Sequence, residues 1–171
     1  MKVRPKLAFF GIVLFQLLIL LGLIGFNEVN LAFGKSVVLQ TVPVDPRDLF
    51  RGDYVMLGYK ISTLSNIPGL WEVDEGGKAY VHLEQRGDVW EAVEVSRERR
   101  AEWDVCISGE VTDVQTNKIR VQYGIESYFV PEGKGKDIQR AKDIKVRVSV
   151  NRLGKATIEG LIVDGVPFQL R

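Results

Sequence analysis

A charged turn runs directly into a strand in the stretch Pro43-Val44-Asp45-Pro46-Arg47-Asp48-Leu49-Phe50-Arg51-Gly52-Asp53-Tyr54-Val55-Met56-Leu57-Gly58-Tyr59. Pro46 fixes its own φ angle and disfavours helix at Asp45, so the stretch begins as a turn. Gly52 permits a sharp bend immediately before the strand. After that bend, apolar side chains recur with the period of a half-buried strand. They are Val55, Leu57, Tyr59 and Ile61.

Side chains of both charges crowd the turn, and they support two interpretations. In the first, the turn is a structural corner in which arginines pair with carboxylates and the carboxylates cap backbone N–H groups. In the second, it is a recognition loop on a rigid scaffold. For the second interpretation we predict a binding surface that joins this turn to a later loop. Its residues are Asp45, Arg47, Asp48, Arg51, Gly52, Asp53, Tyr54, Tyr128, Phe129, Glu132 and Lys134.

The stretch from Gly52 to Tyr59 fits the pattern G-D-Y-x-x-L-x-Y at every fixed position. The chain therefore resembles the GDYXXLXY proteins, a family of bacterial membrane-anchored proteins. The segment Tyr128-Phe129-Val130-Pro131-Glu132-Gly133-Lys134-Gly135 strengthens the resemblance, which extends over most of the chain from Leu39 onward. It implies an N-terminal membrane anchor followed by a β-rich domain, and it implies no particular chemistry.

The N-terminus carries an uncharged run from Leu7 to Phe26, in which Gln16 is the only strongly polar side chain. A helix of about 20 apolar residues spans the hydrocarbon core of a bilayer. Three basic residues precede the run, which places the N-terminus in the cytoplasm. We expect a cytoplasmic tip, anchor and linker in residues 1–34 and an extracytoplasmic domain, periplasmic in a Gram-negative cell, in residues 35–171. The alternative is a signal peptide cleaved after Gly34, which would release a soluble β-domain.

Beyond the turn, alternating apolar residues predict several short strands separated by turns. We expect strands at 37–42, 53–61, 79–84, 89–95, 104–111, 118–123, 125–130, 145–151 and 156–163. This spacing is typical of an all-β barrel or sandwich, with at most one short helix, near Asp137. Residues 62–77 are expected to form a loop, in which Trp71 covers the end of the core.

Composition narrows the chemistry that we expect. The net charge of +1 gives no electrostatic reason to expect nucleic-acid binding. One cysteine, Cys106, and one histidine, His82, are too few for an intrachain disulfide or a multi-histidine metal site. We expect Cys106 to be a small buried residue and His82 to be a half-exposed strand residue. No metal, cofactor or catalytic residue set is predicted.

These observations together predict a non-catalytic binding or assembly component of the cell envelope. Its expected partners are the membrane, through Leu7 to Phe26, and another membrane or envelope protein. The alternative is a membrane-anchored hydrolase with a carboxylate site in the 45–53 loop, formed by Asp45, Asp48 and Asp53. A hydrolase would need these carboxylates to converge in a pocket, whereas a structural corner would pair each of them.

Overall fold

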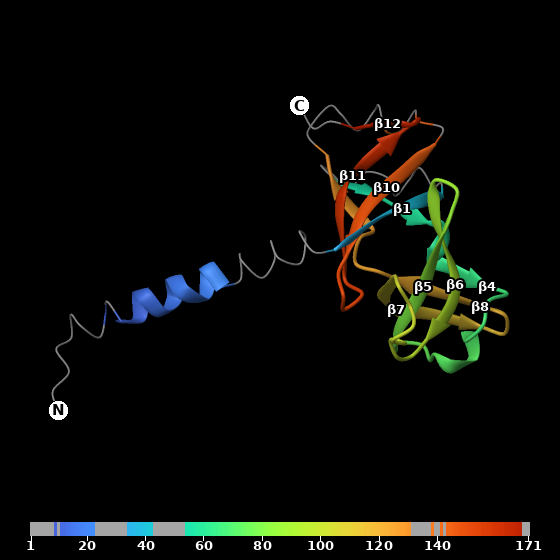
Figure 1. Cartoon of the computed structure of the whole chain (residues 1–171), viewed down its shortest axis with the longest axis horizontal. Coiled ribbons are helices and arrows are strands. Elements are labelled where there is room, and N and C mark those ends of the chain that lie inside the picture. The colour runs from blue at the N-terminus through green and yellow to red at the C-terminus, as the bar shows by residue number, and fades with distance from the viewer. Residues whose placement is uncertain are drawn as a thin grey trace. The chain divides into compact units, whose positions relative to one another are not determined.

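A computed structural model describes residues 9, 11–22, 34–42, 54–130, 138, 141 and 143–168. The chain divides into two units, Met1–Gly34 and Lys35–Arg171, which are coloured from blue to red along the chain in Figure 1. Each unit is described by itself below.

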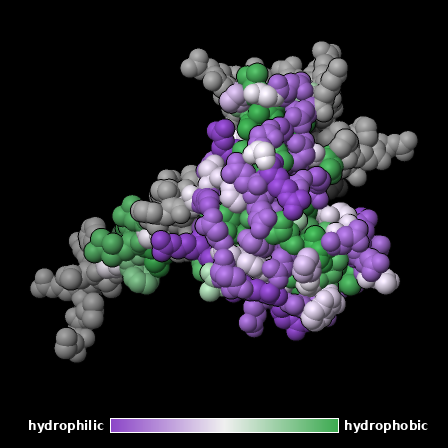
Figure 2. All heavy atoms as spheres, turned by 45° about the vertical axis from the view of Figure 1, so that its right-hand side comes forward, coloured by the Kyte–Doolittle hydropathy of each residue, from purple (hydrophilic) through white to green (hydrophobic). Residues whose placement is uncertain are grey.

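The first unit contains a helical segment, seen at residue 9 and at residues 11–22. Its apolar side chains, among them Phe15 and Leu18, are exposed, and they form a hydrophobic segment in Figure 2. Among the described residues, no helix combines the length and the apolar character needed to cross a membrane. The expected span from Leu7 to Phe26 extends beyond the described helical residues at both ends, so it stays a prediction.

The second unit is built mainly of strands, as the alternation predicts. The described strands are β1 (Lys35–Val42), β2 (Tyr54–Met56), β3 (Gly58–Tyr59), β4 (Thr63–Ser65), β5 (Lys78–Arg86), β6 (Val89–Ser96), β7 (Cys106–Gln115), β8 (Lys118–Gln122), β9 (Ser127–Phe129), β10 (Ile144–Val150), β11 (Ala156–Val163) and β12 (Val166–Pro167). Two short 3-10 helices accompany them, η1 (Lys60–Ser62) and η2 (Leu70–Glu72).

The strands form two five-stranded sheets and one two-stranded ladder. The first sheet has the order β12-β11-β10-β1-β3, and the second has the order β4-β8-β7-β5-β6 (Figure 1). The ladder consists of β2 and β9. All described pairings between strands are antiparallel. Together the strands make a nearly closed, barrel-like arrangement.

The segment from Tyr54 to Ser65 connects the two sheets. β3 pairs with β1 at the edge of the first sheet, and after η1 the chain enters β4 at the edge of the second sheet. At the start of the segment, before β3, β2 pairs with β9, which follows β8 along the chain. The two sheets also meet where β1 lies against β6, and there the Lys35 ammonium is 5.3 Å from the centre of the Trp90 ring.

One hydrophobic core lies between the sheets. In the described residues the strand expected at 53–61 is divided into β2, β3 and η1, which together we call the motif strand, and it contributes to this core directly. Val55, Leu57, Tyr59 and Ile61 are all buried, so the predicted inward face of this strand is confirmed. They join side chains from the central strands of both sheets, including Leu39, Val146, Val81 and Ile107. Burial of this apolar surface is the main favourable contribution to folding.

Ion pairs on the surface also join distant parts of the second unit. Lys145 of β10 pairs with Asp88 in the turn between β5 and β6, and Lys35 of β1 pairs with Asp104. The hydrogen bond from Lys145 lowers the pKa of the Asp88 carboxyl. Both pairs have an exposed carboxylate, and pairs of this kind stabilise a fold only slightly. The apolar core is therefore the main contact between the sheets.

Several expected elements differ from the structure. Residues 62–77 are not a plain loop, because they contain β4 and η2. The strand expected at 104–111 begins later and extends further, from 106 to 115. Trp71 does not cover the core: its side chain is 85% exposed, because η2 directs it outward. The short helix expected near Asp137 falls mostly outside the described residues.

Gly69 holds η2 against β6 at a very close backbone approach. It precedes η2 with φ of 86°, in the left-handed region. A Cβ atom on Gly69 would lie 1.7 Å from the Val95 carbonyl oxygen. Beside it, the Val95 N–H donates a hydrogen bond to the Pro68 carbonyl at 3.1 Å. The position of Trp71 therefore depends on a glycine at residue 69.

We predict that Gly69→Ala destabilises the domain far more than Gly76→Ala. Gly76 has a similar φ of 73°, but no atom lies within 4 Å of the site of its Cβ. Gly76→Ala should therefore cost only the left-handed penalty, about 1–2 kcal/mol. Gly69→Ala should cost this penalty and, in addition, the free energy needed to displace the backbone of β6. Chemical denaturation of the full chain measures both, and equal losses would contradict the close approach at Gly69.

Candidate functional site

The structure describes three of the predicted binding residues, and all three lie on the β2–β9 ladder. Tyr54 lies on β2, and Tyr128 and Phe129 lie on β9, its partner strand. The remaining predicted residues lie outside the described part of the chain: Asp45, Arg47, Asp48, Arg51, Gly52, Asp53, Glu132 and Lys134. The choice between a structural corner, a recognition loop and a carboxylate-based hydrolase therefore stays open for the turn itself.

The outer face of the β2–β9 ladder carries an exposed aromatic pair. Tyr54 is directly opposite Phe129 in the antiparallel register. Their ring centroids are 5.7 Å apart with an interplanar angle of 72°, an edge-to-face arrangement. The two residues are 51% and 52% exposed. Met56 and Ser127 form the other pair on this face, with the Ser127 hydroxyl 3.5 Å from the Met56 sulfur.

We call Tyr54, Met56, Ser127 and Phe129 the ladder surface. Tyr128, one of the predicted binding residues, lies on the opposite face of the ladder. It pairs with Val55 and is partly buried against the core. Burial raises the pKa of the Tyr128 hydroxyl. Because neighbouring residues of a strand point to opposite faces, a surface containing Phe129 excludes the adjacent Tyr128 side chain.

The inner face of the motif strand is fixed by two buried tyrosines. The Tyr59 hydroxyl donates a 2.6 Å hydrogen bond to the Ile125 carbonyl. The Tyr123 hydroxyl donates a 2.6 Å hydrogen bond to the Ile61 carbonyl. Each tyrosine thus bonds to the chain segment that carries the other. The motif strand is joined in this way to the connection between β8 and β9.

Glu126 completes this connection. The Leu57 N–H donates a 2.7 Å hydrogen bond to the Glu126 carbonyl, which extends the pairing of β2 and β9 by one step. The Glu126 carboxylate accepts a 2.6 Å hydrogen bond from the Tyr123 N–H. Gly124 supplies the positive φ of 78° that the turn requires. The segment from Tyr123 to Glu126 is therefore held by hydrogen bonds at both of its ends.

Burial raises the pKa of both tyrosine hydroxyls, and the nearby Glu126 carboxylate raises them further. A neutral hydroxyl is the form that donates these hydrogen bonds, so both groups stay protonated in the folded protein. Their pKa in the unfolded chain is close to the ordinary value of about 10. Their stabilising contribution is therefore complete below pH 10 and decreases as the pH rises above it.

Sequence reasoning found the inward face of the motif strand but not its partners. Tyr123 falls on the inward face by the alternation of residues 118–123, and it is 7% exposed. The two tyrosine hydrogen bonds and the role of Glu126 were not predicted. Tyr59 and Ile125 are separated by 66 residues, so the pairing depends on tertiary structure. One indication in the sequence was that Tyr59 and Tyr123 both fall on inward positions of alternating stretches, and a buried tyrosine hydroxyl needs a partner.

Cys106 and His82 are each packed within the domain. Cys106 is buried, as expected, and burial raises the pKa of its thiol. His82 is half-buried on β5 and stacks on Trp103 at a centroid distance of 5.2 Å. Within the described residues, no group of three or more His, Cys, Asp or Glu side chains could hold a metal ion.

We predict that Tyr59→Phe and Tyr123→Phe each destabilise the domain by about 1–3 kcal/mol. Each change leaves a buried carbonyl without its hydroxyl donor, and this is the usual cost of such a loss. Tyr54→Phe is the matched control, because Tyr54 lies half-exposed on the opposite face of the same strand. Its effect should stay within about 0.5 kcal/mol. Urea denaturation of the full chain gives the three values.

Alkaline pH provides a second measurement on the same variants. The wild-type free energy of unfolding should decrease above pH 10, because the unfolded chain then releases tyrosine protons that the folded protein retains. This decrease should be smaller in Tyr59→Phe and Tyr123→Phe than in Tyr54→Phe. Identical pH profiles for all three variants would contradict the buried tyrosine hydrogen bonds.

Comparison with known proteins agrees with the motif. The family model described as GDYXXLXY protein matches residues 16–161. No curated protein and no solved structure matches the chain. The matched residues include the motif strand, the ladder surface and nearly all strands of both sheets. Because the match covers most of the chain, this protein belongs to the GDYXXLXY protein family.

Proposed function

We propose that this protein is a membrane-anchored, non-catalytic binding component that contacts another membrane or envelope protein through the ladder surface. The observation that supports it best is the Tyr54–Phe129 pair, in which two large aromatic side chains are half-exposed and in mutual contact. Aromatic residues are the commonest energetic anchors of protein interfaces. The pair holds its geometry before binding, which reduces the entropy that association costs.

The location of this pair also favours a recognition role. Each residue of the pair belongs to one of the two segments that carry the family resemblance, Tyr54 to the motif and Phe129 to the segment that begins at Tyr128. Loops on a rigid scaffold often carry binding residues. The buried tyrosine hydrogen bonds make this part of the scaffold rigid. A partner would thus meet the aromatic pair on a rigid part of the domain.

The backbone of the ladder offers a second means of recognition. Among the described residues, β2 and β9 form a two-stranded sheet of their own. An unpaired strand edge can accept an extended segment of a partner through main-chain hydrogen bonds. Met56 lies beside the aromatic pair, and methionine adapts its shape easily to a partner surface. These features fit a protein partner better than a small-molecule substrate.

The membrane part of the proposal rests on the uncharged run from Leu7 to Phe26 and the basic residues before it. A run of this length is sufficient to span a bilayer, and the basic side chains favour a cytoplasmic N-terminus. The exposed apolar side chains of residues 11–22 agree with a lipid environment for this segment. In this arrangement the domain that carries the ladder surface lies in the extracytoplasmic compartment, where its partner would also lie.

We predict site-specific crosslinking from the ladder surface in intact membranes. A photoreactive phenylalanine analogue replaces Phe129 in the full chain, and a second variant of the full chain carries it in place of Leu153 as the control. Leu153 is 67% exposed in the turn between β10 and β11. Position 129 should give one defined crosslinked band that contains a membrane or envelope protein, and position 153 should not. Adding Tyr54→Ala to the first protein should abolish the band.

The outcomes of this experiment are distinct. Equal crosslinking from both positions would show non-specific contact and contradict the proposal. A band from position 129 that survives Tyr54→Ala would contradict the role of the aromatic pair. Tyr54 is half-exposed and its hydroxyl is not part of the buried tyrosine hydrogen bonds, so its removal should leave the fold intact.

A further inference from the structure

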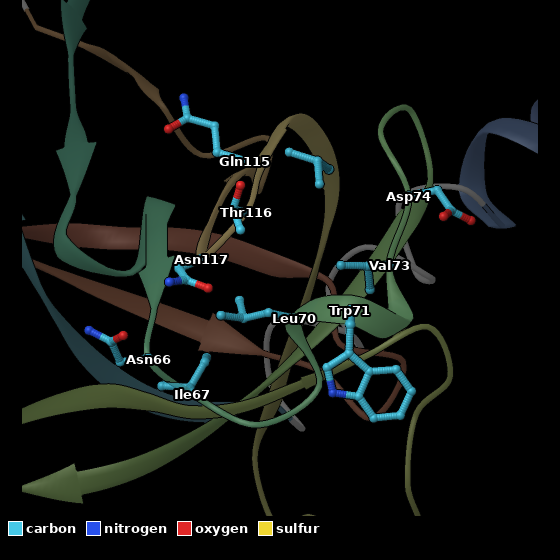
Figure 3. A pocket seen from close by; sticks show the side chains of 10 residues that line it. Asn66, Ile67, Leu70, Trp71, Val73, Asp74, Gln115, Thr116 and Asn117 are labelled. Carbon is cyan, nitrogen blue, oxygen red and sulfur yellow. The ribbon is translucent and has the colours of Figure 1, made fainter.

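An open groove of about 610 Å³ lies beside η2 and the turn between β7 and β8 (Figure 3). Ile67 and Leu70 contribute apolar surface to it. In Figure 3, Asn66 and Asn117 lie on one side of Leu70 and Trp71 lies on the other. The groove shares no residue with the ladder surface, so it is a separate candidate site on the same domain.

Trp71 is the most unusual residue of this groove. Its side chain is 85% exposed, which is a large apolar surface left in contact with water. The backbone that carries it is firmly held, because Gly69 packs directly on the Val95 carbonyl. The Glu72 N–H also donates a 2.9 Å hydrogen bond to the Gly69 carbonyl. The exposed indole is therefore a property of the fold, at a fixed place on the rim of the groove.

The polar lining of the groove is mainly neutral. It is made of the amides of Asn66, Gln115 and Asn117 and the hydroxyl of Thr116. One carboxylate, Asp74, also lines it, and this carboxylate pairs with Arg97. A phosphate or nucleotide site would present unpaired Arg or Lys side chains. The described lining contains none, which favours an uncharged ligand.

The lining combines the two contacts that an uncharged sugar requires. One face of a pyranose ring presents C–H groups, which pack on the face of an aromatic ring. Its rim presents hydroxyls, each of which both donates and accepts hydrogen bonds. Amide side chains match them, because the carbonyl accepts and the NH2 group donates. An open groove with an aromatic side chain at one end also suits an extended chain of sugars better than an enclosed drug-sized molecule.

We propose that this groove binds a neutral oligosaccharide. The Trp71 indole stacks on one pyranose ring, and the amides of Asn66 and Asn117 hydrogen-bond the hydroxyls of a neighbouring ring. Ile67 and Leu70 contact the apolar faces between them. Glycan binding at this groove does not depend on protein binding at the ladder surface, so either could fail without the other.

Titration calorimetry of the full chain tests the proposal with two soluble probes. One is the β-1,4-linked tetramer of N-acetylglucosamine, and the other is the β-1,4-linked tetramer of glucose. A detergent without a sugar headgroup must be used, since a glycoside detergent would compete for the groove. We expect saturable binding of at least one tetramer. Trp71→Ala should weaken it by about tenfold, the value of one lost stacking contact.

Three variants separate stacking from general effects. Trp71→Tyr keeps an aromatic ring and should lose less affinity than Trp71→Ala. Asn66→Gly removes one amide but tolerates the positive φ of 57° at this residue, so it should weaken binding without backbone strain. Trp90→Phe changes a partly buried tryptophan outside the groove and should bind as wild type. No saturable binding of either tetramer, or wild-type affinity in Trp71→Ala, would overturn the proposal.

Discussion

The two hydrogen bonds from Tyr59 to Ile125 and from Tyr123 to Ile61 join the motif strand to the connection between β8 and β9. The rest of the second unit depends on this junction, because the motif strand is where the two sheets meet. β3 ends the first sheet and β4 begins the second, and only η1 separates them along the chain. Apolar burial supplies most of the stabilisation, but it does not depend on the orientation of the buried groups. The tyrosine hydrogen bonds are directional, since each hydroxyl donates to one carbonyl on the other segment.

The same strand performs two tasks on its two faces. Leu57 and Tyr59, two fixed positions of the family motif, are 5% and 1% exposed and belong to the core. Tyr54, a third fixed position, faces outward and contacts Phe129. Packing in the core therefore explains Leu57 and Tyr59 of the motif, but it does not explain Tyr54. This division explains why the aromatic pair, rather than the buried half of the motif, is the feature on which we base a binding function.

Much of the fold could be predicted from local pattern. The inward positions 55, 57, 59 and 61 and the hairpins β5–β6 and β10–β11 follow from alternation and from turn residues. The partners of Tyr59 and Tyr123 could not be predicted, because they lie 66 and 62 residues away along the chain. Trp71 was misjudged for a related reason. Its exposure follows from the close approach of Gly69 to Val95 on β6. This tertiary contact cannot be predicted from the sequence around residue 71.

Hydrogen exchange of the full chain tests the central claim most directly, that the motif strand joins the two sheets and opens only when they unfold. The Leu57 N–H bonds to the Glu126 carbonyl, while Val146 and Val81 lie on central strands of the first and second sheets. If the claim holds, the Leu57 amide exchanges only when the whole domain unfolds, with the same free energy of opening as Val146 and Val81. Rapid exchange of Leu57 while both central strands stay protected would show that the motif strand opens on its own, and it would contradict the account.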